Sequence, residues 1–261
     1  MSDFISIRKG RNVLSVVMHM VLNLALAVGS TAITIATQSW VLGVLLVFLS
    51  KWRMLAVRSR YWFLNLKSNI VDIVVGVSLV MLVYYAGVTE IKIAHVVWTV
   101  VYAVWLLVIK PRSSELMTET QSLVAVFLGM SAGSIMASNL DSAVIAIGGF
   151  VVGYGASRHI LAQSEDHDFT MITFVSGLIM AEVSWLLYHW LIVYSFGSSG
   201  LVIPQLAVVA TLATFLFIKA YKSIIRHDGK MKLAEVVMPT VFSVLVIVIM
   251  VLWFSKPMFN V

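Results

Sequence analysis

Residues 13–50 read VLSVVMHMVLNLALAVGSTAITIATQSWVLGVLLVFLS and contain no Asp, Glu, Lys or Arg. A single helix over this stretch would be about 57 Å long at 1.5 Å per residue, nearly twice a hydrocarbon core of about 30 Å. The stretch therefore predicts two membrane-spanning helices joined by a turn. The turn is expected at residues 29–31 or 37–39, where small polar residues interrupt the Leu/Val pattern.

The composition of the whole chain also indicates a lipid bilayer. The 261 residues are 61% hydrophobic and 11% charged, with a mean hydropathy of +0.99, whereas soluble domains are about half apolar and a quarter charged. Because each span takes about 20 residues, the length allows roughly nine spans and almost no soluble domain. The chain has no cysteine, which excludes disulfides, thiolate metal sites and iron–sulfur ligation.

Apolar runs between charged or turn-rich breaks predict the architecture. We expect an all-α fold, a polytopic integral membrane helix bundle in which residues 1–261 form a single transmembrane domain. About nine transmembrane helices are expected, at residues 13–30, 33–50, 69–86, 93–109, 119–138, 140–156, 170–195, 202–221 and 235–254.

The distribution of Lys and Arg predicts the orientation. With nine spans, all 18 basic residues except Lys92 and Lys256 fall on one side of the membrane. Positive residues concentrate on the cytoplasmic side of a bacterial-type inner membrane, so we expect a cytoplasmic N-terminus and an external C-terminus. The net charge of +6 then reflects topology, and no nucleic-acid partner is expected.

The longest expected cytoplasmic loop, residues 51–68, is both basic and aromatic. Such a segment can lie among lipid headgroups, with aromatic side chains inserted and basic ones on anionic lipid. The residues expected to contact anionic lipid or a partner are Lys51, Trp52, Arg53, Arg58, Arg60 and Trp62. The alternative is a positive-inside anchor without a specific partner. Asp72, about one turn inside the next span, is expected to form a salt bridge with Lys67 or this loop.

Small residues at intervals of four predict close helix packing. Gly129 and Gly133 lie in the span 119–138, and Gly149 and Gly153 lie in the span 140–156. Small side chains at this spacing let two backbones approach closely. The short connection between the two spans predicts a tight antiparallel hairpin. The same faces could instead pack against a second copy or a partner in a membrane complex.

Glu182 is the one acidic residue that the span assignment places near the bilayer centre, in the span 170–195. An ionisable group there costs about 2.5–3.5 kcal/mol, so it indicates a functional site. His189 lies seven residues later on the same helical face, and the polar stripe of the first span contains His19 and Asn23. The sequence predicts a transport or proton path between these two spans, with Asn23 as the partner of Glu182.

Each of these polar residues also has a purely structural interpretation. Glu182 could be a protonated acid that is hydrogen-bonded to a neighbouring helix. His189 is flanked by aromatic residues and could belong to the interfacial aromatic belt. His19 and Asn23 could make simple interhelical hydrogen bonds, each worth about 0.6 kcal/mol.

The function that these observations favour is a small transporter-like permease, proton-coupled through Glu182. The alternative is a non-catalytic membrane subunit or scaffold, whose basic loop binds lipid or a cytoplasmic protein. An enzyme is the least favoured class, because no recognisable catalytic, nucleotide-binding or metalloprotease motif is present. We expect no catalytic residues, no metal site and no cofactor.

Overall fold

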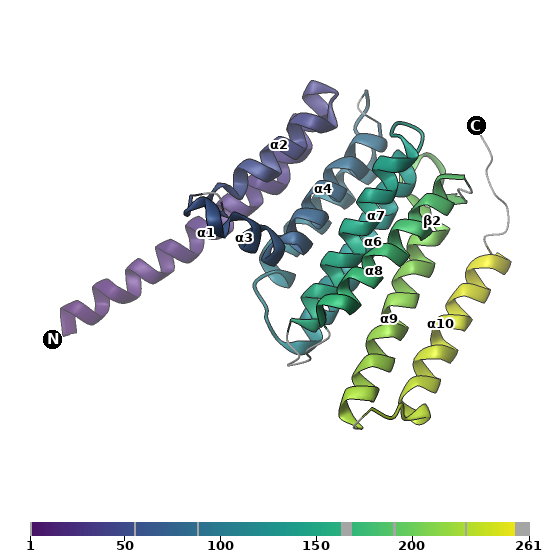
Figure 1. The fold of residues 1–261 in the computed structure, drawn as a ribbon. Helices are drawn as coiled ribbons and strands as arrows, with labels where there is room; N and C mark the ends of the chain where they lie inside the picture. Colours follow the sequence, from purple (N-terminus) through teal and green to yellow (C-terminus); the bar gives the residue numbers. More distant parts are fainter. Residues whose placement is uncertain are drawn as a thin grey trace.

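The computed structural model of the chain describes residues 2–54, 56–87, 89–162, 169–189, 192–227 and 229–253. They form helices that lie side by side from α1 to α10, together with one short β-hairpin (Figure 1). The longer helices are α1 (Ser2–Thr37), α2 (Trp40–Ser50), α4 (Ile70–Tyr85), α5 (Ile93–Val104), α6 (Glu115–Met136), α7 (Ser142–Leu161), α8 (Phe169–His189), α9 (Gln205–Arg226) and α10 (Leu233–Trp253). The shorter elements are η1 (Trp52–Met54), η2 (Ser59–Tyr61), α3 (Trp62–Ser68), the π-helical η3 (Trp105–Ile109), η4 (Gly197–Ser199), β1 (Val193–Ser195) and β2 (Val202–Pro204).

Several helices have the length and composition of membrane spans. In the described part of the chain, five helices are long and apolar enough to cross a membrane: α1 from Val13 onward, α7, α8, α9 and α10. The helix α4 reaches this length only together with the preceding segment Ser59–Ser68, from which it is bent by 68°. Both α2 and the segment formed by α5 and η3 are apolar but shorter. The predicted all-α class is confirmed apart from the β-hairpin.

The first turn lies at the second of the two expected positions. Gln38 adopts a positive φ of 52°, and Ser39 caps α2 by accepting a hydrogen bond from the amide of Val41. The predicted boundaries 13–30 and 33–50 are therefore wrong, since α1 continues to Thr37. Ser30 donates to the carbonyl of Ala27, and Thr34 donates to that of Ser30, so these hydroxyl groups are satisfied inside the helix and do not end it.

The β-hairpin was not predicted. The expected span 170–195 ends at His189, and the expected span 202–221 begins only at Gln205 and continues to Arg226. Between them, β1 pairs with β2 in antiparallel register, with Tyr194 opposite Ile203. Gly200 at φ +75° lies in the turn, where a left-handed backbone favours glycine. Apolar β-strands and apolar helix ends have the same composition, so the apolar run concealed the boundary.

The centre of the bundle is α4, most of whose side chains are buried. The expected antiparallel hairpin of α6 and α7 packs on it. Gly129 of α6 lies where a Cβ would meet Val74 of α4 and Val152 of α7. Further along the same pair, the hydroxyl of Ser122 donates to the carbonyl of Ala156 at 3.1 Å. A small residue and a hydroxyl thus bring the three helices into close contact.

The other small residues serve different contacts from the one expected. Gly149 and Gly153 of α7 face α8, where a Cβ on Gly153 would lie 2.6 Å from Cγ of Met180 and 2.7 Å from the carbonyl oxygen of Ser176. Gly133 has no atom within 4 Å of its Cβ position and borders an apolar hollow of about 310 Å³. Glycine therefore determines how closely α7 and α8 pack.

Contacts between helix ends define two ends of the bundle. At one, called here the charged end, Lys51 and Lys110 meet Asp72, and Lys219 meets Glu119. The other, called the hairpin end, includes Ala86, Lys92 and the β-hairpin, because a Cβ on Gly200 would contact Lys92 and Ala86. Thus α2, η3, α7 and α9 finish at the charged end, and α4 and α6 begin there.

Enlarging Gly153 should destabilise the bundle, whereas enlarging Gly133 should not. We expect Gly153→Ala to lower the stability by about 1–3 kcal/mol, since its methyl group would collide with backbone and side-chain atoms of α8. Gly133→Ala should leave stability unchanged or raise it by up to about 1 kcal/mol through helix propensity. Thermal unfolding of the detergent-purified protein measures both. Equal unfolding midpoints for the two variants would contradict this account of the α7–α8 contact.

Candidate functional site

A buried ion cluster, called here the Asp72 cluster, joins three segments at the charged end. Asp72 lies in the first turn of α4, where its Oδ2 pairs with the ammonium groups of Lys51 and Lys110, the latter at 2.7 Å. Its Oδ1 accepts a hydrogen bond of 2.9 Å from Nε1 of Trp105. The side chains of Lys51 and Asp72 are only 7% and 10% exposed. Every carboxylate oxygen is paired, as a buried charge requires.

The electrostatic balance of the cluster is one negative charge against two positive ones. Burial lowers the pKa of the Lys51 ammonium, the positive charge of Lys110 acts in the same direction, and the carboxylate of Asp72 opposes both. The prediction that Lys51 contacts lipid is therefore wrong, because its side chain is buried against Asp72. The expected salt bridge of Asp72 with the basic loop is formed by Lys51. Lys67 instead places its ammonium over the ring of Phe63, at 5.6 Å.

The remaining predicted loop residues lie at the surface. Trp52, Arg53, Arg58, Arg60 and Trp62 are all exposed. The guanidinium of Arg60 stacks on the ring of Tyr61 at 4.6 Å, and the indole of Trp62 donates to the carbonyl of Val57. Their position is compatible with contact to lipid headgroups, which stays a prediction.

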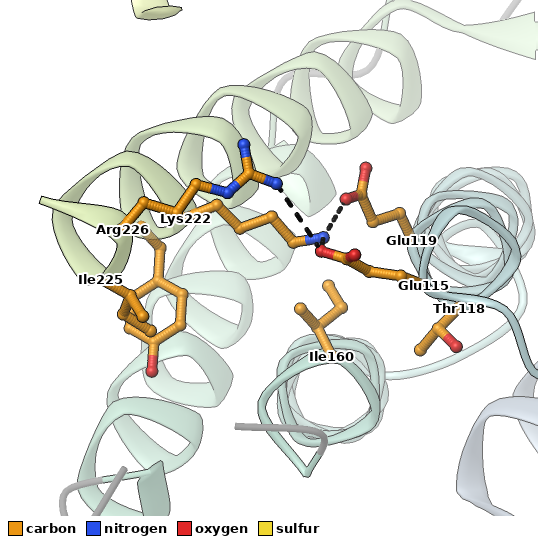
Figure 2. Close-up of a pocket in the computed structure, with 8 residues that line it drawn as sticks. Glu115, Thr118, Glu119, Ile160, Lys222, Ile225 and Arg226 are labelled. Carbon is orange, nitrogen blue, oxygen red and sulfur yellow. Dashed lines mark hydrogen bonds and ion pairs between the residues drawn. The ribbon is translucent and has the colours of Figure 1, made fainter. Parts of the chain in front are cut away.

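A second charged site, called here the Glu119 pocket, lies between α6, α7 and α9 (Figure 2). Lys222 of α9 pairs with both Glu115, at 2.5 Å, and Glu119 of α6. Lys219 is 3.0 Å from Glu119, and Arg226 is 4.0 Å from Glu115. The pocket has a volume of about 360 Å³ and is lined by Glu115, Thr118, Glu119, Ile160, Tyr221, Lys222, Ile225 and Arg226.

Helical spacing explains why these charges meet. Glu115 and Glu119 are four residues apart on α6, and Lys219, Lys222 and Arg226 follow at intervals of three and four on α9, so each set forms one stripe. Two acids against three bases leave one excess positive charge. Arg226 carries it nearest the surface, because its side chain is 62% exposed and its closest acid is 4.0 Å away. The spacing is visible in the sequence, but which two helices face each other is not.

Gln121 and His159 connect the two charged sites. Nε2 of Gln121 donates to the carbonyls of Ile109 and Arg112, both at 2.8 Å, where the π-helical η3 ends. Its Oε1 is 2.6 Å from Nε2 of His159 on α7. These contacts link α6 to the end of η3 and to α7, between the Asp72 cluster and the Glu119 pocket. Neither residue was identified from the sequence, because each lies singly at the end of an apolar run.

Two separate hollows between α8 and α9, called together the α8–α9 groove, lie between the Glu119 pocket and the hairpin end. The first hollow, about 310 Å³, lies between Val175 and Ile179 of α8 and Ala213 and Phe217 of α9. The second, about 590 Å³, is lined by Val183, Leu186, His189, Ile192, Gln205, Leu206 and Val209. Ile160 of α7 lines both the first hollow and the Glu119 pocket. The three cavities border successive stretches of α9 from Arg226 to Gln205, and their lining residues turn around the helix, since Arg226 and Phe217 lie on opposite sides of it.

Polar groups occur along the groove as well as at its ends. Ser157 donates to the hydroxyl of Ser176 at 2.6 Å beside the first hollow, which Thr214 also lines. His189 and Gln205 line the second hollow near the hairpin end. Among the described residues, no group of three or more His, Asp or Glu side chains is placed to hold a metal ion. The groove can therefore bind a ligand through apolar surface and hydrogen bonds.

The structure does not bring the predicted path residues together. His19 and Asn23 are 3.3 Å apart on α1, which packs against α2, α4 and α5. Glu182 and His189 lie on α8, with α4, α6 and α7 between the two helices (Figure 1). The expected path between the first and seventh spans, with Asn23 as partner of Glu182, is therefore wrong. The sequence gives the depth of a residue in a span but not the lateral order of the helices.

Glu182 lies on α8 between residues that line the two hollows of the α8–α9 groove, although it lines neither hollow itself. Its side chain is exposed, which differs from the buried position expected for it. Ile179, three residues before it, lines the first hollow, and Leu186, four residues after it, lines the second. Residues at these spacings share one side of a helix, so Glu182 lies on the side of α8 that borders the two hollows. His189 lies in the groove and contacts the ring of Trp185 edge to face at 4.9 Å.

No family model, curated protein or solved structure matches the chain. The function is therefore inferred from the charged end and from the groove. The Asp72 cluster is fully paired and buried, which is typical of a structural role. The groove is open and has polar groups at both ends, which makes it the stronger candidate for a binding site.

Removing the carboxylate of Asp72 should unfold the charged end. We expect Asp72→Ala to cost about 3–5 kcal/mol, because it leaves the buried ammonium of Lys51 unpaired. The double variant Asp72→Leu with Lys51→Met should recover much of the loss, because Lys110 can reach water. Thermal unfolding measures both, with the exposed acid variant Glu90→Ala as the control. If Asp72→Ala unfolds at the same temperature as Glu90→Ala, the cluster does not stabilise the fold.

Proposed function

We propose that the protein is a small permease of a bacterial-type inner membrane, with nine spans, a cytoplasmic N-terminus and an external C-terminus. Each of the nine expected apolar ranges overlaps a helical segment, five of the described helices are long and apolar enough to cross a membrane, and the segments alternate in direction between the two ends. The charged end holds lysines and arginines from several loops, which supports a cytoplasmic location. The helix α2 is only about 17 Å long, so the bilayer must thin locally or neighbouring residues must complete the crossing.

The observation that carries this proposal is the α8–α9 groove. Together with the Glu119 pocket, it borders successive stretches of α9 from Arg226 at the charged end to Gln205 near the hairpin end. Polar groups occur at both ends and beside the first hollow. A path through a membrane needs such groups to replace water around its cargo. The groove thus supplies polar groups along a route between the two ends, which the expected path between the first and seventh spans does not.

Proton coupling is assigned to Glu182. A carboxylate directed toward hydrocarbon costs about 2.5–3.5 kcal/mol, and taking up a proton or pairing with a cationic group of the cargo relieves this cost. Its place on the side of α8 that borders the two hollows lets its protonation state affect whatever passes there. His189 in the second hollow can exchange the proton toward the hairpin end.

A scaffold or non-catalytic membrane subunit is the second candidate function. Its support is the first part of α1, from Val13 to Leu24, where nearly every side chain is exposed and the helix extends away from the bundle (Figure 1). The hollow beside Gly133 offers another surface for a partner helix. A scaffold predicts that Gly133→Leu releases a co-purifying membrane protein, whereas a permease predicts no such loss.

The permease predicts a flux that depends on the groove and on Glu182. Proteoliposomes that contain a pH-sensitive dye should take up protons when a small-molecule extract of bacterial cells is added outside. We expect Glu182→Gln to lower this extract-dependent uptake at least about tenfold, because the amide cannot carry a proton. Ala213→Trp should lower it similarly by filling the first hollow.

The matched control is Ala25→Trp, an equal enlargement of an exposed alanine on α1, far from α8 and α9. This variant should transport at the rate of the unmodified protein. Unchanged uptake in Glu182→Gln would exclude the assigned proton carrier. The absence of any extract-dependent uptake by the unmodified protein would contradict proton-coupled transport.

A further inference from the structure

We infer that the α8–α9 groove binds one anionic phospholipid, with its phosphate at Arg226 and an acyl chain along α9 toward His189. The inference rests on the proposed function, because it assigns a lipid to the groove that the proposed path uses. An amphipathic ligand is indicated by the order of the three cavities. A charged pocket is followed by two hollows that are mainly apolar.

The apolar part of the groove fits an acyl chain. Side chains of α8 and α9 that line the first hollow are widely exposed, such as Met171 at 71%, Ile179 at 54% and Phe217 at 40%. Hydrocarbon can cover these apolar side chains favourably. In its described part, the groove presents no row of unpaired backbone groups that would need hydrogen-bond partners. A transmembrane helix is about 10–12 Å wide with its side chains, too wide for a hollow of about 310 Å³. A single chain of methylene groups fits it.

The charges of the Glu119 pocket favour an anionic headgroup. Lys222 is held between Glu115 and Glu119, whereas the guanidinium of Arg226 is mostly exposed. A guanidinium can bind a phosphate through two parallel hydrogen bonds. The exposed residues Lys230 and Lys232 follow within six residues of Arg226 and add positive charge to the same end. A phosphodiester with one negative charge complements the single excess positive charge of the pocket.

The length of the groove agrees with one lipid leaflet. From Arg226 to Ala213 there are 13 helical residues, or about 20 Å along α9. One leaflet of a bilayer, from headgroup to midplane, is about 20–22 Å deep. A phosphate at Arg226 therefore places the end of its acyl chain near Ala213. This is the part of α9 that lines the first hollow.

The test is lipid binding by the full-length protein, measured by native mass spectrometry after titration with phosphatidylglycerol or phosphatidylcholine of identical acyl chains. We expect one phosphatidylglycerol per chain, bound at least tenfold more tightly than phosphatidylcholine. Arg226→Gln should weaken binding about fivefold, which corresponds to about 1 kcal/mol for one basic residue at a membrane surface. Ala213→Trp should weaken binding of both lipids at least tenfold, because its indole fills the first hollow.

Two controls separate the groove from the rest of the basic surface. Arg112→Gln removes an exposed arginine of the charged end that is assigned no lipid contact, and Ala25→Trp enlarges an exposed alanine on α1. Both variants should bind phosphatidylglycerol like the unmodified protein, and unchanged unfolding midpoints should show that all variants are folded. Equal affinity for the two lipids, or equal weakening by Arg112→Gln and Arg226→Gln, would overturn the inference.

Binding and transport fail independently in these experiments. The titration uses no gradient and measures no flux. If the protein binds phosphatidylglycerol in the groove but takes up no protons, the lipid site is supported and the permease is contradicted. If the protein takes up protons with the extract but does not prefer phosphatidylglycerol, the permease is supported and the lipid site is contradicted.

Discussion

The pairing of Asp72 with two lysines is the interaction on which the charged end depends. A buried carboxylate is tolerated only when each oxygen has a partner, and here those partners come from the end of α2, from η3 and from the residue after it. Three segments that are distant in the sequence are thereby fixed at one level. The end of η3 then presents the carbonyls that Gln121 of α6 binds, and His159 of α7 joins the same contact.

The helices were largely predictable from the sequence, because apolar runs of sufficient length and hydroxyl-rich breaks follow from the bilayer and from turn chemistry. The turn at Gln38 was one of two expected positions, and the hydroxyl groups of Ser30 and Thr34 made the other look equally suitable. A hydroxyl side chain can donate its hydrogen bond to a carbonyl of the preceding helical turn. Hydroxyl residues therefore indicate the end of a helix only where the backbone can also change direction. Gln38 and Ser39 supply both features.

The neighbours of each helix were not predictable in the same way. Depth along a span follows from counting residues, which placed Asn23 and Glu182 at similar levels and suggested a pair. Lateral order depends on which side chains interlock, and this was decided by Gly153 against Met180 and by Lys222 against Glu119. A glycine or a lysine in the sequence does not identify its partner. The β-hairpin was missed for a related reason, since its apolar residues continue the pattern of the helices beside it.

The groove follows from the way that its two walls are held. The helix α8 is bound to α7 through Gly149 and Gly153, where any side chain would collide. The helix α9 is bound to α6 through charges at one end, where Lys219 and Lys222 meet Glu119. Ile160 of α7 borders both the Glu119 pocket and the first hollow, so α7 contributes to both sites. The two walls are thus positioned by different partners, because α8 packs closely on α7 whereas α9 forms ion pairs with α6.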